Sequence, residues 1–193
     1  QLAQAAPEGR WRVVAQIALA GALMRLGDWE GSLRETGRGQ EMLAAEPEFA
    51  ASRAGRRLAA SLYVALSNVH VHRGAVGESL DACRKALVEA RGGADLACEA
   101  AALNNMGNAL RALGRADEAL AAYRASLEID RRTGDRAGIA SGLNNVGNIH
   151  RARGELDAAE GPFRQALALR REIGDQAGVA ACLGNLGNLE GQR

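Results

Sequence analysis

The stretch that decides the fold is LNNMGNALRALGRADEALAAYRASLEIDRRTGDRAGIASG, residues 103–142. The following residues, 143–182, read LNNVGNIHRARGELDAAEGPFRQALALRREIGDQAGVAAC, and 18 of the 40 aligned positions are identical without a gap. A half-copy, LGNLGN at 183–188, continues in the same phase, and Asn68 lies 40 residues before Asn108. Self-similarity at a fixed period indicates a stack of repeated structural units.

Each repeat contains the apolar spacing of two helices. The first helix has an i, i+3, i+7, i+10 stripe of Leu103, Met106, Leu110 and Leu113, and Gly114 ends it. Asp117 is expected to cap a second helix over Ala119–Leu127. A hairpin of this size cannot bury its own apolar face and must stack on its neighbours. With 3% aromatic residues and 41 alanines among 193 residues, the sequence predicts an all-α fold. We expect a right-handed superhelical α-solenoid of about nine helices.

The period divides the chain into units. We expect residues 1–193 to form a single array, with a capping unit at 10–48, full units at 49–95, 96–135 and 136–175, and a half unit at 176–193. The spacing of the first unit is longer, which predicts an extra loop around Pro47.

These positions resemble tetratricopeptide repeats (TPR) of the long, 40-residue type. The family pattern of small and large residues matches Leu103, Met106, Gly107, Leu110, Gly114, Ala119, Tyr123 and Ser126, and recurs forty residues later with Gly147, Ala159 and Phe163. The usual helix-ending proline is replaced by Arg131 and Arg171. HEAT and armadillo repeats have a similar period, but they would not need small residues at Gly107, Gly114 and Ala119 together. The resemblance implies a scaffold similar to peptide-binding arrays, kinesin light chains and bacterial regulators.

Composition and charge exclude several classes of function. The net charge of +1 gives no general attraction to nucleic acid, and the longest apolar run, 13–24, is too short to span a membrane. The three cysteines have no metal-type spacing, which favours reduced thiols and a cytoplasmic protein. No catalytic constellation is present, so we expect a non-enzymatic protein without metal or cofactor. His70 and His150 are interpreted as satisfied inter-helix residues, and Cys83 as a small core residue.

Asparagine and arginine recur on a second stripe, away from the apolar one. Asparagine is a poor residue inside helices, so its recurrence needs a reason. In the resembling arrays this stripe lines a concave groove, where asparagines hold the main chain of an extended peptide. The candidate groove residues are Asn68, Asn104, Asn108, Arg111, Asn144, Asn148, Arg151 and Asn188. The amides would pair with peptide backbone, and the arginines with a carboxylate. Alternatively, the amides join neighbouring helices or face water.

The sequence therefore predicts an interaction module that binds an extended or acidic peptide segment of a protein partner. The alternative is a sensor arm of a larger multidomain regulator, with an NTPase or protease beside the array, that binds a small effector or controls the fused domain. Self-association is also predicted, because Leu183, Leu186 and Leu189 on the last helix lack a following helix to cover them.

Overall fold

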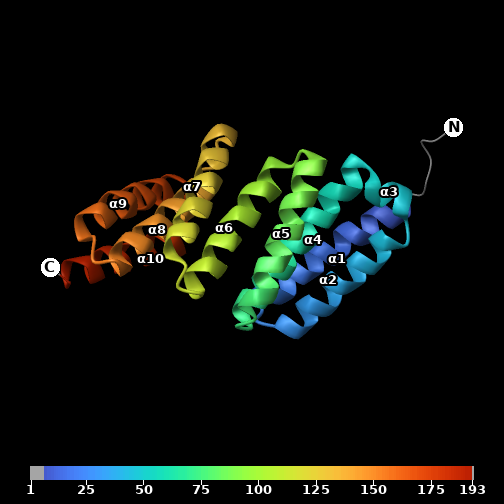
Figure 1. Cartoon of the computed structure of the whole chain (residues 1–193), viewed down its shortest axis with the longest axis horizontal. Helices are drawn as coiled ribbons and strands as arrows, with labels where there is room; N and C mark the ends of the chain where they lie inside the picture. The colour runs from blue at the N-terminus through green and yellow to red at the C-terminus, as the bar shows by residue number, and fades with distance from the viewer. Residues whose placement is uncertain (1–6, 193) are drawn as a thin grey trace. The chain divides into compact units, whose positions relative to one another are not determined.

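The computed structural model describes residues 7–192, and every regular element in that range is an α-helix. This confirms the all-α prediction. The ten helices are α1 (Pro7–Arg25), α2 (Trp29–Ala44), α3 (Pro47–Ala51), α4 (Arg53–His72), α5 (Val76–Gly93), α6 (Leu96–Ala112), α7 (Ala116–Thr133), α8 (Arg136–Ala152), α9 (Leu156–Glu172) and α10 (Gln176–Glu190) (Figure 1). The additional helix is α3, which replaces the loop expected around Pro47, because proline is well suited to the first turn of a helix.

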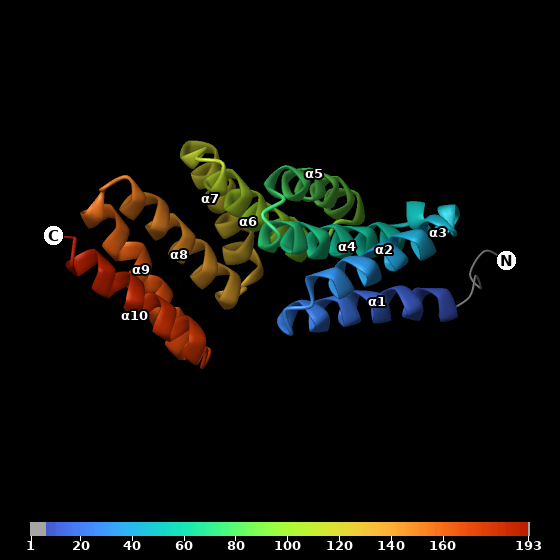
Figure 2. The same cartoon turned by 90° about the horizontal axis from the view of Figure 1, so that it is seen from below.

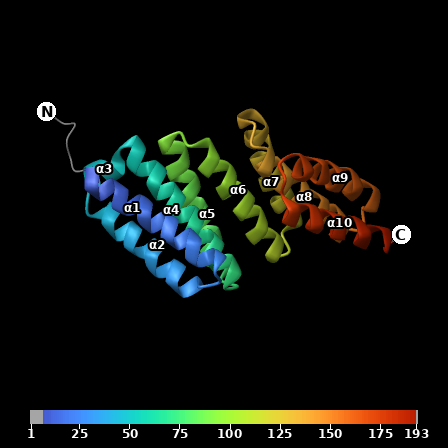
Figure 3. The same cartoon turned by 180° about the vertical axis from the view of Figure 1, so that it is seen from behind.

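Two compact units make up the chain, one ending at Ala109 and the other beginning at Leu110, so that the boundary falls inside α6. In the first unit α1 packs on α2 and α4 packs on α5, while α2 and α3 also contact α4 (Figure 1). In the second unit α8 contacts α7 and α9, and α10 contacts α9 and α8 (Figure 3).

Turn chemistry sets the helix ends. Gly114 has φ of 73°, a left-handed conformation that glycine adopts without strain, so α6 stops just before it as predicted. The prediction that Asp117 caps the next helix is wrong. The N-cap of α7 is Arg115, and Asp117 lies in the first helical turn, where its Oδ1 accepts a hydrogen bond from Arg153 Nη2 at 2.5 Å. Asp135, by contrast, caps α8 by accepting from the Gly138 N–H.

Helices α8 and α9 form a hairpin (Figure 2). A glycine and an aromatic ring meet where the two helices pack. A Cβ atom added at Gly147 would lie only 2.7 Å from Phe163 Cε1, so the ring occupies the space that a side chain would need. Phe163 is fully buried in a cluster with Ala159 and Leu189. A small residue thus packs directly against an aromatic one at two positions of the repeat pattern. Helix α9 also runs on through Pro162 rather than ending there.

The last helix is better covered than the sequence suggested. Leu189 is 1% exposed, and Leu186 packs against the same cluster, so the prediction that both lack a cover is wrong. The reason is that α9 reaches this side of α10. Only Leu183, 48% exposed, matches the prediction.

Candidate functional site

In the second unit α8 and α10 contact each other, and one of the predicted amides lies at this contact. Asn144 Oδ1 accepts a hydrogen bond from Asn185 Nδ2 at 2.8 Å, which ties α8 to α10. This bond is the helix-to-helix arrangement that we considered as the alternative to peptide binding. Asn148, one turn further along α8, is half-buried, and Asn188 is exposed. The two amides of α8 therefore have different surroundings.

The two predicted arginines also differ, because of one hydroxyl group. The exposed Arg111 is hydrogen-bonded to the Tyr123 hydroxyl. Burial raises the pKa of Tyr123, and the nearby guanidinium opposes that rise. Forty residues later Phe163 replaces the tyrosine, so Arg151 has no such acceptor. Arg151 is half-buried, and its Nε has no hydrogen-bond partner among the residues that the structure describes.

In the first unit, Asn68, Asn104 and Asn108 are half-buried. A neighbouring amide that we did not predict joins α4 to α6 by a hydrogen bond. Asn105 is 7% exposed, and its Nδ2 donates to Ser67 Oγ at 2.8 Å. The signal was present in the sequence, because Asn105 recurs as Asn145 and Asn185 at the same interval.

A small polar cluster surrounds Ser67. Its hydroxyl donates to the Val64 carbonyl at 2.7 Å, while the Ser79 hydroxyl donates to the Ser67 carbonyl at 3.0 Å. Cys83 is fully buried beside both serines, and burial raises the pKa of its thiol to about 11. Cys83 is thus a core residue, as predicted, and its thiol stays protonated at neutral pH.

The histidines are not equally satisfied. His150 Nδ1 lies 2.5 Å from Glu155 Oε2, in keeping with the prediction. His70 Nδ1 is buried without a hydrogen-bond partner, so the prediction is wrong for this residue. The position that matches Glu155 is Ala75, which offers no acceptor side chain. Burial lowers the pKa of His70, so its ring is neutral at physiological pH. Within residues 7–192, no group of three His, Cys, Asp or Glu side chains could hold a metal ion.

Asp130 is a buried carboxyl group without a cation beside it in the described part of the chain. It is 5% exposed, and the Ser126 hydroxyl donates to Oδ2 at 3.3 Å. A Cβ atom at Gly138 would lie 2.6 Å from its Cγ, so a glycine makes room for the carboxyl group. Burial raises the pKa of Asp130, and the charge of Asp135 adds to the rise.

Replacing Asp130 by asparagine should stabilise the protein at neutral pH. Because the pKa of Asp130 is higher in the folded protein than in the unfolded chain, this group stabilises the fold at pH values below its unfolded-state pKa. The stabilisation is lost as the pH rises through its folded-state pKa. Asparagine carries no charge to desolvate, so we expect the free energy of unfolding at pH 7 to rise by about 1 kcal/mol. Urea unfolding at several pH values measures this free energy. The control is Asp117→Asn, because the Asp117 side chain is 92% exposed. Equal pH dependence in the parent and Asp130→Asn proteins would contradict the interpretation.

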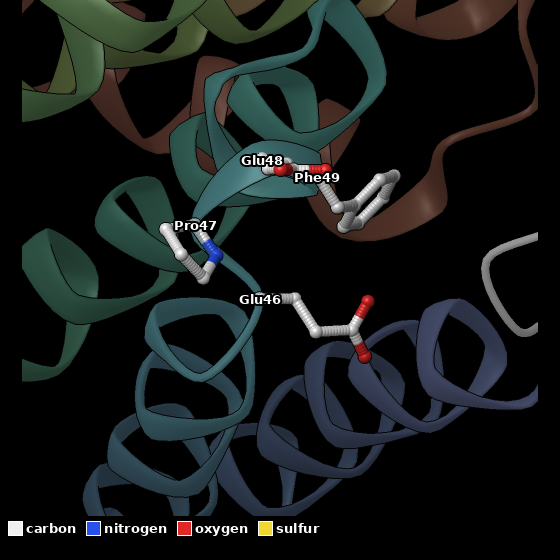
Figure 4. Close-up of a pocket in the computed structure, with 4 residues that line it drawn as sticks. All are labelled: Glu46, Pro47, Glu48 and Phe49. Atoms are coloured by element: carbon white, nitrogen blue, oxygen red, sulfur yellow. The ribbon is translucent and has the colours of Figure 1, made fainter. Parts of the chain in front are cut away.

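The insertion that breaks the repeat pattern forms a hollow that we did not predict. Glu46, Pro47, Glu48 and Phe49 line a space of about 360 Å³ (Figure 4). The guanidinium of Arg10 lies 4.6 Å from the centre of the Phe49 ring. No forty-residue repeat crosses this segment, which is why the periodicity gave no signal for it.

In these helix hairpins a glycine faces an aromatic ring, and the first helix of each hairpin carries a polar stripe. Such hairpins define a helical-repeat protein. The sequence matches the tetratricopeptide repeat family at residues 58–132, 98–172 and 138–193. The chain therefore belongs to the tetratricopeptide repeat family, as the resemblance indicated. No relative was found among curated protein sequences.

Solved structures share the fold. Aspartyl phosphate phosphatase F from Bacillus subtilis matches 92% of this chain with a TM-score of 0.78 and 10% identity. A signal transduction ATPase with numerous domains and a tetratricopeptide repeat sensor, from Pyrococcus horikoshii, matches 92% with a TM-score of 0.73 and 15% identity. BtubC from P. vanneervenii matches 97% with a TM-score of 0.65 and 17% identity. The chain spans 45% and 27% of the first two proteins and 85% of the third.

Membership of this family assigns the chain a general role. Tetratricopeptide repeats are scaffolds for protein–protein interaction. Among the described helices, none combines the length and the apolar character needed to cross a membrane.

Proposed function

We propose that this chain binds an extended, acidic segment of a partner protein along the polar stripe of its first helices, without catalysis. The residues involved are Asn68, Asn104, Asn108, Arg111, Asn144, Asn148, Arg151 and Asn188. The observation that carries the proposal is the buried Nε of Arg151, which has no acceptor among the described residues. A buried donor without a partner costs about 1–3 kcal/mol, which an incoming acceptor recovers.

The chemistry of the site favours a carboxylate. A guanidinium pairs with a carboxylate through two parallel hydrogen bonds, and partial burial strengthens the pair. Asn148 lies three residues before Arg151 and therefore on the same side of α8. Its amide offers both a donor and an acceptor, which suits the N–H and C=O groups of an extended chain. Together they would bind one acidic residue and the peptide bond next to it.

The predicted residues that already make hydrogen bonds within the chain would have supporting roles. Asn144 is fixed to Asn185, so it would keep α8 and α10 in register and bind peptide only with its remaining donor groups. Arg111 is held by the Tyr123 hydroxyl, which would orient its guanidinium toward a second acidic residue. Arg151 is then the stronger anchor of the two, because its Nε loses no existing bond on binding.

The Asn148→Ala, Arg151→Ala double variant should lose affinity by about 30-fold or more, since each removed contact to a charged or backbone group is worth about 1–2 kcal/mol. The probes are peptides selected on the parent chain from a library of extended peptides with a fixed central glutamate, measured by fluorescence anisotropy. Each selected peptide is also tested with glutamine in place of that glutamate.

The control is Arg124→Ala, because Arg124 is exposed on α7 and removes the same charge elsewhere. We expect Arg124→Ala to bind as the parent does and the thermal midpoint of the double variant to stay within a few degrees. The proposal is wrong if the double variant binds normally, or if glutamine peptides bind as well as glutamate peptides.

A second candidate is a sensor arm in a larger regulator. It is favoured by the shared fold of the Pyrococcus horikoshii protein, whose repeats are described as a sensor. A catalytic or nucleotide-binding domain in the full gene product, with an activity that changes when the array is deleted, would support this candidate.

A further inference from the structure

Helix α2 buries a face that is mostly polar. Ser32, Glu35 and Thr36 are 1%, 8% and 0% exposed, and Gly39 is buried as well. This face packs on α1 and α4, which both lie in the first unit. Leu43, near the end of the helix, is the one large apolar residue of α2 that is buried. Because burial of apolar surface is what mainly holds a helix on its neighbours, α2 is held weakly along most of its length.

The second helix of the next unit has apolar residues at the matching positions. Gly27 and Gly74, the turn glycines before α2 and α5, lie 47 residues apart and set the alignment. All the matching residues of α5 are buried. The matching pairs are Glu35 with Ala82, Thr36 with Cys83, Gly39 with Ala86 and Gln40 with Leu87.

Two polar atoms between α1 and α2 are buried without a hydrogen-bond partner among the described residues. They are Gln16 Oε1 and the hydroxyl of Ser32. Gln16 faces α2, because a Cβ atom at Gly39 would lie 3.5 Å from its Cβ. In the next unit the matching serine, Ser79, donates to the Ser67 carbonyl at 3.0 Å. Water would satisfy both atoms if α2 moved away, so their burial favours opening.

The helix itself is also intrinsically weak. Gly31, Gly37 and Gly39 lie within its sixteen residues, and each glycine favours the unfolded chain over the helix. The carboxylate of Glu35 accepts a hydrogen bond from Arg38 at 2.7 Å. Both residues belong to α2, so this ion pair survives when the helix leaves and does not hold it in place.

The contacts that hold α2 lie at its two ends. Near the start, Trp29 stacks on His72 with 4.4 Å between the ring centroids. Glu30 and Arg73 form an ion pair of 3.1 Å there, but both side chains are exposed to water, which weakens it. Near the other end, Leu43 packs into the apolar cluster of the first unit.

We propose that α2 detaches from α1 and α4 while α4 and α5 stay folded, so that the first unit has a closed and an open state. The open state is the minor one, because the contacts at both ends of α2 must break. Opening uncovers Val13 and Leu62, which are 3% and 0% exposed in the closed state. The inference is independent of the peptide site, because α2 carries none of the residues proposed to bind peptide.

The test compares a thiol in α2 with a thiol in α5 of the full chain. Thr36→Cys puts a thiol at the buried position that matches Cys83, and the two side chains at position 36 are similar in size. A thiol reagent is added under native conditions, and peptide mass spectrometry measures the labelling of each cysteine. We expect the thiol at position 36 to be labelled about 100-fold faster than Cys83, since only α2 opens locally.

Gly37→Ala, added to Thr36→Cys, tests the cause. A Cβ atom at Gly37 would meet nothing within 4 Å, so alanine fits there and favours the helix. Labelling at position 36 should slow about fivefold, and that of Cys83 should not change. The matched control is Gly184→Ala, at an equally open glycine of α10, which should leave both rates unchanged.

Hydrogen exchange of the parent chain measures the same opening without a substitution. This measurement is needed because Thr36→Cys removes the bond from the Thr36 hydroxyl to the Ser32 carbonyl. The amides in the middle of α2 should exchange about 100-fold faster than those in the middle of α5. Equal protection of the two helices in the parent chain overturns the proposal, as does equal labelling of the two thiols.

Discussion

Phe163→Ala will lower the free energy of unfolding by about 3–5 kcal/mol, as is usual for a fully buried aromatic residue. Its ring fills the space at Gly147 and also contacts the cluster that includes Leu189, so its loss leaves a cavity among α8, α9 and α10. In repeat proteins, stability is the sum of the unit stabilities and the interfaces between neighbours. We therefore expect the C-terminal hairpin to unfold before the rest, and hydrogen exchange to show lost protection in α8 to α10 first.

One control makes this prediction specific. Phe163→Tyr keeps the ring and tests whether a hydroxyl is accepted, as Tyr123 is accepted forty residues earlier. We expect it to cost far less than alanine, because a hydroxyl at this position would lie near Arg151, as that of Tyr123 does near Arg111. Equal losses for alanine and tyrosine would contradict the packing argument.

Ser67→Ala should have the second largest effect, about 2 kcal/mol, although it removes a single oxygen atom. The Asn105 amide donates to this hydroxyl while buried, so the variant leaves a buried donor without a partner. The loss of unfolding free energy should largely disappear in the Ser67→Ala, Asn105→Leu double variant, because neither polar group remains there. Chemical denaturation of the two single variants and the double variant measures the coupling.

Ser61→Ala is the matched control, because Ser61 also lies on α4 but its hydroxyl is less buried, 3.3 Å from Cys98 Sγ. We expect a change within about 0.5 kcal/mol, typical of positions that can still be reached by water. If Ser61→Ala and Ser67→Ala cost the same, the buried amide is not what makes Ser67 important.

The sequence by itself determined the helices, their pairing and the family, because a repeat with helical spacing allows few other ways to bury its apolar stripes. The tight contact between Gly147 and Phe163 followed from the same pattern. The side of the helix on which the amides lie was also predictable, since position along a helix fixes direction.

Only the tertiary structure decided which polar groups are engaged. Asn144 and Asn148 recur in the same way in the sequence, yet the first is bonded to Asn185 and the second is not. Arg111 and Arg151 likewise differ through Tyr123 and Phe163, which lie on another helix. The cover over Leu189 and the short helix α3 depend in the same way on which helix is adjacent. A period in sequence fixes what each unit contains, whereas a hydrogen bond depends on distances between units that the period does not specify.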